Sequence, residues 1–147
     1  MKMQAGKMQK GFTLPEVMIV VAIMAILAAI AYPSYVQYVT RSNRSAAESF
    51  IMTVSNKQEQ YMLDARQYAS DVPAVSAVTA LNLTVPTEVS KNYNITVAAS
   101  AGPPPSYTIT AQPTGTQLAK DTKCVNVFIN QLGAKGISGP GPLSSCW

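Results

Sequence analysis

An apolar run near the N-terminus is the feature that most constrains this chain. It extends over residues 12–32, 21 residues in all, and from Val17 onward none of them carries a charge. As a helix rising about 1.5 Å per residue, such a run can cross the roughly 30 Å hydrocarbon core of a bilayer. One acid, Glu16, lies near its start, and three lysines but no acid precede it. The sequence therefore predicts a membrane-spanning helix with one carboxylate at its beginning.

Two simpler interpretations compete with one in which Glu16 has a function. A cleaved secretory signal has an apolar region of about 7–15 residues followed by small residues, a pattern that Ala29-Ile30-Ala31 fits. A plain membrane anchor has no use for Glu16, because an acid near the centre of a membrane helix costs about 2.5–3.5 kcal/mol. Nearer the helix end the cost is lower, so the anchor stays an alternative. No cation within the apolar run can neutralise Glu16.

Pro15 indicates where the helix begins. Inside a helix, proline removes a hydrogen bond and clashes with the preceding turn, at a cost of about 3 kcal/mol or more. In the first turn this cost disappears, because the N–H groups there have no intrahelical acceptor. If the chain is cut between Gly11 and Phe12, Pro15 is the fourth residue of the new chain. Glu16 then lies beside the positive end of the helix dipole and the new α-amine.

The N-terminal residues resemble those of a type IV prepilin. The resemblance is carried by the apolar run and by two motifs, Gly11-Phe12-Thr13-Leu14-Pro15-Glu16 and Ala31-Tyr32-Pro33-Ser34-Tyr35. It implies that a membrane prepilin peptidase cuts after Gly11 and methylates the amine of Phe12. It also implies that Glu16 pairs with the Phe12 amine of a neighbouring subunit during filament assembly. Proline at position 15 departs from the aliphatic residue common in the family, but it is compatible with a helix start.

Charge and composition fit a single domain with an anchor. The chain of 147 residues has a net charge of +4, but residues 1–11 hold three of its 11 basic side chains and no acid. The other 8 basic side chains face 7 acidic ones, so the pI of about 9.1 is weak evidence for a nucleic-acid partner. With 48% apolar and 12% charged residues, the composition suits a subunit that packs against copies of itself.

Two cysteines, Cys124 and Cys146, lie in the last quarter of the chain. The export signal places this region outside the cytoplasm, where a disulfide can persist. Both cysteines belong to one short glycine-rich region, which favours a disulfide over the alternative of two free thiols. Closing a loop of this size contributes about 3–4 kcal/mol in the chain-entropy model.

A second helical pattern follows Pro33. Proline at this position should bend the helix and free the carbonyl near Ala29, and a helix that ends before Pro33 is the alternative. We expect continuation to about Ala65, because apolar residues recur at spacings of three and four. This stripe should face the domain core and consists of Ala47, Phe50, Ile51, Val54, Tyr61, Met62 and Ala65, with Gln58 as one polar intrusion. The charged residues off the stripe are Arg41, Arg44, Glu48, Lys57 and Glu59.

The rest of the chain predicts a connector and a small antiparallel sheet. Residues 66–91 lack clear periodicity, which indicates a long connector with room for a short helical turn. Alternating apolar residues then predict three strands, with a fourth at 134–138 after a turn at 131–133. The alternating sets are Tyr93, Ile95 and Val97, then Tyr107, Ile109 and Ala111, then Val125, Val127 and Ile129. Residues 139–142 alternate glycine and proline, so we expect the disulfide to hold the C-terminal loop.

The residue types of most enzyme sites are missing from the sequence. It has no histidine, so it has no histidine base and no imidazole metal ligand. Its seven acids are scattered, without a close pair suited to two-carboxylate chemistry. Two widely spaced cysteines do not make a zinc site. The sequence therefore predicts a protein that is not an enzyme, with no cofactor and no metal.

Three lysines are candidate DNA contacts. Lys120, Lys123 and Lys135 lie in the C-terminal region with only Asp121 against them, and Tyr107 and Trp147 could lie near. Solvated loop lysines are the alternative, because so small a patch releases few counterions. The C-terminal part resembles PilE-type minor pilins, which in turn resemble ComP-like pilins that act as DNA-uptake receptors. Those receptors usually carry an additional disulfide, which two cysteines cannot form.

Taken together, these features predict an α+β type IV pilin. Residues 1–11 would be a cleaved basic leader, and residues 12–33 the part of a long helix that serves as membrane anchor and then as filament core. Residues 34–147 would form a globular domain, with a three- to four-stranded antiparallel sheet on the outer half of the helix and a C-terminal loop closed by Cys124 and Cys146. Glu16 and Pro33 would act in assembly.

The resemblance also implies location and partners. The subunit would lie in the inner membrane as a single-pass protein and then in an extracellular pilus, with the prepilin peptidase and other pilin subunits as partners. We expect a structural and minor subunit that supports pilus biogenesis, twitching motility, adhesion or DNA uptake. A pilus-displayed DNA receptor and a type II secretion pseudopilin are the alternatives.

Overall fold

The computed structural model describes residues 11–71 and 76–147. Its longest element is α1, a helix of 52 residues from Leu14 to Ala65 that contains Pro33. The prediction that the helix continues past Pro33 is therefore confirmed. The chain divides into two units, residues 1–36 and 37–147, and α1 contributes to both.

The described part of the first unit contains the beginning of α1. Pro15 and Glu16 lie in the first helical turn, as the preference of proline for that position predicts. Side chains from residue 14 to residue 35 are all exposed. Among the described helices, α1 is the one that is long and apolar enough to cross a membrane.

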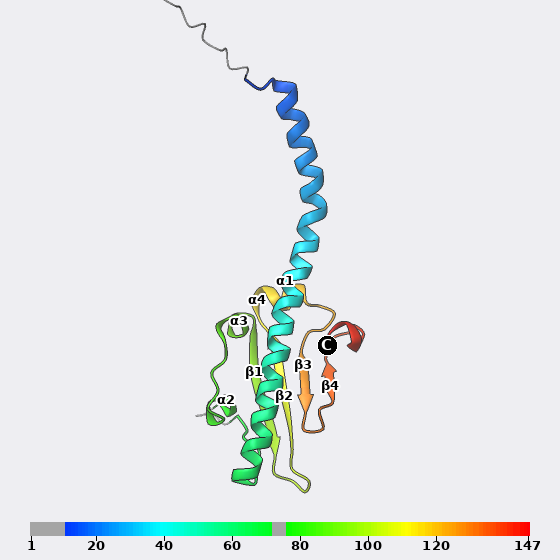
Figure 1. The fold of residues 1–147 in the computed structure, drawn as a ribbon. Helices are drawn as coiled ribbons and strands as arrows, with labels where there is room; N and C mark the ends of the chain where they lie inside the picture. Colours follow the sequence, from blue (N-terminus) through cyan, green and yellow to red (C-terminus); the bar gives the residue numbers. More distant parts are fainter. Residues whose placement is uncertain (1–10, 72–75) are drawn as a thin grey trace, which may run out of the picture. The chain divides into compact units, whose positions relative to one another are not determined.

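The second unit holds a four-stranded antiparallel sheet in the order β1-β2-β3-β4 (Figure 1). Its strands are β1 (Tyr93–Ser100), β2 (Ser106–Pro113), β3 (Val127–Asn130) and β4 (Lys135–Ile137). The register places Ile95 opposite Ala111 and Ile109 opposite Ile129. Because side chains alternate along a strand, these apolar residues share one face of the sheet.

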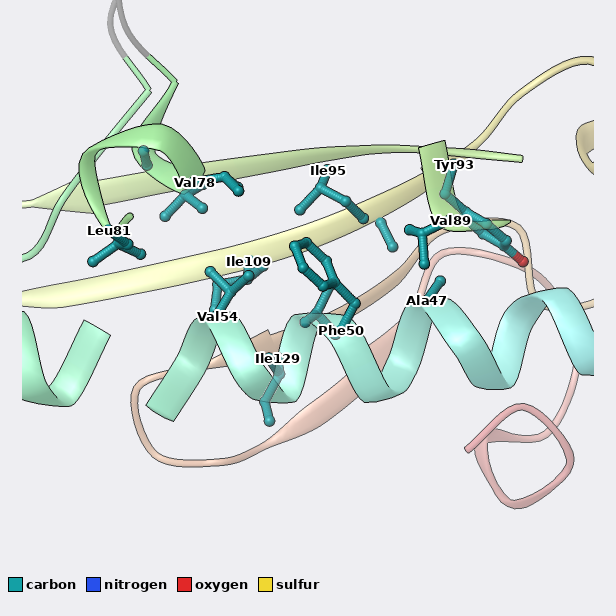
Figure 2. Close-up of a cluster of buried hydrophobic side chains, with 14 of the residues drawn as sticks. Ala47, Phe50, Val54, Val78, Leu81, Val89, Tyr93, Ile95, Ile109 and Ile129 are labelled. Carbon is teal, nitrogen blue, oxygen red and sulfur yellow. The ribbon is translucent and has the colours of Figure 1, made fainter. Parts of the chain in front are cut away.

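The second half of α1 covers this apolar face and closes the core (Figure 2). Ala47, Phe50 and Val54 point from α1 toward the sheet, where Ile95 and Ile109 lie opposite them. All five side chains are buried, and Ala47, Val54 and Ile109 are completely so. Burying a side chain of this size contributes about 1.5–3 kcal/mol, so this layer supplies much of the stability of the domain.

The connector between α1 and the sheet is more ordered than the sequence predicts. It contains two short helices, α2 (Ala77–Ala80) and α3 (Thr87–Ser90), which add Val78 and Val89 to the core. Its residues 72–75 lie outside the described part of the chain. The side-chain amide of Gln58, the polar intrusion in the stripe, donates to the Ala69 carbonyl at 2.6 Å and accepts from the Ala69 N–H at 2.9 Å. This buried pair fixes the chain just after α1.

The start of the connector, at Ser70 and Asp71, also protects one edge of the sheet. Asp71 accepts a hydrogen bond from the Val97 N–H at 2.6 Å, and its own N–H donates to the Val97 carbonyl at 3.0 Å. The Ser70 hydroxyl accepts from the Ala99 N–H at 3.2 Å. The backbone of β1 is thereby paired at its outer edge, where an open strand would invite pairing with other chains.

Two local predictions are wrong, and one helix was not predicted. Strand β3 begins at Val127, because Val125 adopts a positive φ of 52° that a strand cannot hold. Ala65 is exposed because α1 ends there and the core lies nearer the middle of the helix. A helix that no sequence pattern predicts, α4 (Gly115–Lys120), follows β2, and Gly115 opens it at a φ of 53°.

Candidate functional site

The N-terminal motif forms the first turn of α1 with Glu16 facing the exposed backbone of that turn. The Thr13 N–H donates to Glu16 Oε2 at 3.4 Å, and the Val17 N–H donates to the Thr13 carbonyl at 3.2 Å. The carboxylate therefore lies at the positive end of the helix dipole. Among the described residues Glu16 forms no salt bridge, and Phe12 is 83% exposed.

The apolar residues that follow Glu16 are not covered by any described part of the chain. Ile23 is 52% exposed and Ile30 is 70% exposed, and the residues between them are similar. A contiguous apolar surface of this kind marks contact with a membrane or with other proteins. The geometry thus separates the two functions of α1, since its first part needs an external apolar environment and its second part does not.

A buried polar network joins α1 to α4, β1 and the C-terminus. Arg44 Nη1 donates to Asp121 Oδ1 at 2.7 Å, and Arg44 Nη2 donates to the Ser145 carbonyl at 3.1 Å. The Tyr93 hydroxyl donates to Asp121 Oδ2 at 3.3 Å and accepts from Gln117 Nε2 at 2.8 Å. The expectation that Arg44 lies off the buried stripe is wrong, since only 7% of it is exposed. Its burial is tolerated because its charge is paired and hydrogen-bonded.

The electrostatics of this network follow from burial. Burial raises the pKa of the Tyr93 hydroxyl, and the charge of Asp121 raises it further. Burial also raises the pKa of Glu48, while the positive charges of Arg44 and Lys135 act in the opposite direction. No buried side-chain nitrogen or oxygen among the described residues lacks a hydrogen-bond partner. The network is therefore a structural element that holds α4 and the C-terminus on α1.

The C-terminal loop is held by more than its disulfide. Cys124 and Cys146 form the predicted disulfide, with an S–S distance of 2.07 Å. The N–H of Gly139 donates to the Cys124 carbonyl at 3.0 Å, and the N–H of Gly141 donates to the Lys123 carbonyl at 2.8 Å. A Cβ at position 139 would lie 2.2 Å from the Lys123 oxygen, so glycine is required there. The disulfide that was expected to hold this loop is present, and these backbone hydrogen bonds hold the loop as well.

The structure does not bring the three candidate DNA-binding lysines together. Lys120 ends α4 and Lys123 follows shortly after, and both are exposed. Lys135 begins β4, where its Nζ lies 4.6 Å from the centre of the Trp147 ring. Tyr107 is buried and its hydroxyl donates to Glu59 Oε1 at 3.1 Å, so it is not exposed beside the lysines. Of the three candidate lysines, only Lys120 and Lys123 are close together in the chain, and neither forms a salt bridge within the described residues.

The described residues hold no group of three or more histidine, cysteine, aspartate or glutamate side chains that could bind a metal ion. The disulfide occupies both cysteines, and Asp121, the buried acid, is paired with Arg44. The side chains that sequence analysis considered for chemistry therefore act in folding or lie exposed.

Two family models match the chain in adjacent stretches. Residues 6–32 match the prokaryotic N-terminal methylation motif. Residues 33–128, more than half of the chain, match the model described as type IV minor pilin ComP, DNA uptake sequence receptor. The chain belongs to this family of type IV minor pilins. Its α+β fold, with the long N-terminal helix, the small antiparallel sheet and the C-terminal disulfide, is the one the sequence predicts.

One solved structure similar to this pilin is that of a type IV pilin from Shewanella oneidensis. The two share 17% sequence identity with a TM-score of 0.49, over 74% of this chain and 97% of the other. No curated protein matches the sequence of the pilin.

Family membership carries general consequences for this pilin. It is a structural subunit and not an enzyme, it is processed by prepilin peptidase, and it assembles with other pilin subunits. The methylation motif and the apolar helix anchor the prepilin in the inner membrane before it enters an extracellular pilus.

The buried network is the feature that sequence analysis missed. A signal for part of it exists, since Arg44 continues the spacing of three and four that runs through Ala47 and Ile51 to Gln58. A charged residue in such a series is still expected outside the core, because a lone charge is rarely buried. Its partner, Asp121, lies 77 positions away in the sequence, and no local pattern connects the two.

Proposed function

We propose that this pilin is a minor subunit that enters the pilus through the first part of α1. Cleavage between Gly11 and Phe12 removes the leader 1–11 and creates an α-amine, which is methylated. Residues 12–33 then form the filament-core part of the helix, and residues 34–147 form the domain displayed on the pilus. The observation that carries this proposal is the exposed apolar helix that begins with a single carboxylate lacking a salt-bridge partner among the described residues.

Assembly follows from the physical properties of this helix. Lipid and the filament interior are both apolar, so moving the helix from one to the other gains little hydrophobic free energy. Packing between helices and pairing of charges must then favour the filament. Glu16, at the positive end of the helix, would pair with the Phe12 amine of a neighbouring subunit and so select the register between subunits. Pro33 removes one backbone hydrogen bond and allows the helix to adjust at the end of the apolar run.

A fibre-incorporation experiment tests this proposal. Glu16→Gln removes the charge with little change of shape, and Glu88→Gln, an exposed acid on α3, is the matched control. We expect the Glu16 variant to be at least about tenfold depleted from sheared fibres, since a lost charge-assisted contact weakens assembly by about 1.5–3 kcal/mol. The control should enter fibres at the wild-type level. Equal incorporation of both variants contradicts the pairing.

The intact mass of the subunit from the same fibres tests the processing. We expect a chain that begins at methylated Phe12 and contains one disulfide. A chain that still begins at Met1, or one that begins at Tyr32, contradicts the proposed cleavage site.

We also propose that the displayed domain binds duplex DNA and supports DNA uptake. The observation in its favour is the match of residues 33–128 to a family whose description names a DNA uptake sequence receptor. Lys120 and Lys123 are the candidate contacts, because both are exposed and neither forms a salt bridge within the described residues. Lys135 is a weaker candidate because it stacks on Trp147.

The DNA proposal predicts a salt-dependent affinity. Each lysine that neutralises a phosphate steepens the dependence of log K on log salt by about 0.9. Lys120→Gln with Lys123→Gln should therefore weaken binding and reduce the slope of log K against log salt by the contribution of about two phosphate contacts. The control pair, Lys57→Gln with Arg66→Gln, should leave both unchanged. Absence of any mobility shift of duplex DNA at low salt contradicts DNA binding.

A further inference from the structure

Exposed cations gather at the end of the domain where α3 and α4 lie (Figure 1). Gln117 of α4 donates to the Thr40 carbonyl at 3.0 Å, which places α4 beside Arg41. The Thr114 N–H, before α4, donates to the Asn92 carbonyl at 2.8 Å, which places the residue after Lys91 at the same end. We call this surface the basic end; its residues are Arg41, Lys91, Lys120 and Lys123.

The basic end carries excess positive charge. Its one exposed acid is Glu88 of α3, because Asp121 is buried and paired with Arg44. Elsewhere in the described domain, apart from the buried pair of Arg44 and Asp121, the charges are nearly balanced, with cations at 57, 66 and 135 and acids at 48, 59, 64 and 71. A local excess of this kind attracts a polyanion or an anionic surface.

Apolar and aromatic side chains are exposed at the same end. Leu118 of α4 is 48% exposed between the cations of the basic end. Tyr38 lies one helical turn before Arg41 and is 71% exposed. Tyrosine is enriched where helices leave the hydrocarbon region, and an exposed leucine among lysines is typical of surfaces that bind at the lipid interface.

The length of chain between the apolar run and the basic end limits their separation. Arg41 follows Tyr32, the last residue of the run, by nine residues. Within a helix nine residues span about 14 Å, which is close to the electrostatic screening length of about 10 Å at moderate salt. This limit holds for any orientation of the domain relative to the membrane helix. Arg41 is therefore within reach of the headgroups whenever the apolar run lies in the bilayer.

We propose that the basic end docks on anionic phospholipid headgroups while the pilin is anchored in the membrane. Lys91, Lys120 and Lys123 contact phosphate groups, and Leu118 enters the interface between them. Entry into the pilus then requires release of this contact, so the lipid charge modulates the pool of subunits ready for assembly. The proposal uses the membrane anchor and is independent of DNA binding by the displayed domain.

Lipid is favoured over DNA as the ligand of the complete basic end. Arg41 and Tyr38 are held near the bilayer by the chain itself, because only nine residues separate Arg41 from the end of the apolar run. Exposed Leu118 adds little to binding a phosphate backbone but contributes to insertion at an interface. DNA binding by Lys120 and Lys123 can follow once the subunit has left the membrane.

Quenching by brominated lipid tests the docking on the full chain. The protein is reconstituted in nanodiscs of phosphatidylcholine with or without phosphatidylglycerol, with brominated acyl chains present in both. Leu118→Trp reports on the basic end. Leu132→Trp is the matched control, because Leu132 is 81% exposed in the β3–β4 turn at the other end of these strands. Native Trp147 is kept in both variants as a constant background.

We expect the tryptophan at position 118 to be quenched more than the one at position 132, and only in discs with phosphatidylglycerol. Lys120→Gln with Lys123→Gln should lower the ratio of docked to undocked domains about 30-fold, and the Lys57→Gln with Arg66→Gln control should not. Equal quenching at both positions, or quenching without anionic lipid, overturns the proposal. So does loss of duplex DNA binding in the Lys120 and Lys123 variant with unchanged lipid quenching, which would leave these lysines to DNA alone.

Discussion

Helix α1 has two parts that use the same backbone in opposite ways. From residue 14 to residue 35 its side chains are all exposed, although the segment is almost entirely apolar. From residue 37 onward it is mixed in polarity, yet it buries a stripe that includes Ala47, Ile51 and Val54 completely. The first part needs a lipid or protein environment from outside, and the second finds its environment in the sheet of its own chain.

The two parts also differ in how they treat charge. Glu16 in the first part forms no salt bridge among the described residues, whereas Arg44 in the second part is paired with Asp121 at 2.7 Å. An unpaired acid at the head of an apolar helix indicates a partner in another molecule. A paired, buried arginine indicates a structure that is complete within one chain. In our proposal, the unpaired carboxylate and the uncovered apolar side chains of the first part together form the assembly surface of this protein.

The largest effect is expected when the first part of α1 is removed together with the residues before it, that is, residues 1–36. A chain of residues 37–147 should be monomeric and soluble without detergent, because its apolar side chains are covered by its own sheet. The full chain should require detergent or lipid. Size-exclusion chromatography with light scattering measures this, and urea unfolding followed by Trp147 fluorescence should give the same midpoint for both. Aggregation of the shortened chain would show that the domain depends on the membrane segment.

The next largest effect is expected in the buried network of the second part. Asp121→Ala leaves Arg44 buried without its main partner and should lower the free energy of unfolding by about 3–5 kcal/mol. Asp64→Ala, at an exposed position of the same chain, is the control and should change it by less than about 0.5 kcal/mol. Urea titration measures both. Similar small losses in the two variants would mean that the Arg44 contact contributes little to stability.

A smaller effect on stability is expected when the same substitution, isoleucine to valine, is made in each of the two parts of α1. Ile51→Val removes one buried methylene group and should cost about 0.5–1.5 kcal/mol of domain stability. Ile23→Val removes the same group from an exposed position and should leave the unfolding of the domain unchanged. Both substitutions keep a β-branched side chain, so helix propensity hardly differs. An equal loss at both positions would contradict the independence of the two parts.

The smallest effect is a change of slope that appears only in alkaline solution, and it concerns Tyr107 of β2, whose hydroxyl donates to Glu59 in the second part of α1. Burial raises the pKa of Tyr107 from 10.0 to about 12, and its hydrogen bond to Glu59 raises it as well. The folded state thus holds this proton more tightly, so its stabilising contribution is complete below pH 10 and is lost as the pH rises toward 12. Tyr107→Phe should make the fall in stability between these pH values shallower. An unchanged slope in alkaline urea titrations would assign that fall to other groups, such as buried Tyr93.

Local patterns were sufficient to predict α1 and the four strands of this fold. The helix begins where Pro15 allows it, continues past Pro33 because apolar spacing resumes, and is followed by strands where Ile95, Ile109 and Ile129 alternate with polar residues. The predicted disulfide is present for a related reason, since the two cysteines share one short region. Each of these features depends on residues that are close in the sequence.

Other features could not be predicted from local patterns. Val125 leaves the strand pattern because its N–H donates to the Asp121 carbonyl at 3.0 Å, a contact of the turn that follows α4. Helix α4 lacks an apolar stripe of its own, and it is held in place by Gln117 through contacts to Thr40 and Tyr93. The two contacts of Gln117 join residues that are 24 or more positions apart.

The sequence by itself determined the membrane segment, the position of its carboxylate and the order of helix and strands. These depend on hydrophobic periodicity and on the geometry of proline, both of which act within a few residues. Only the tertiary structure decided that Arg44 is buried, that the Lys135 ammonium lies over the Trp147 ring and that α4 lies beside Thr40 of α1. Burial and charge pairing depend on which distant segments meet, and that is known only when the chain has folded.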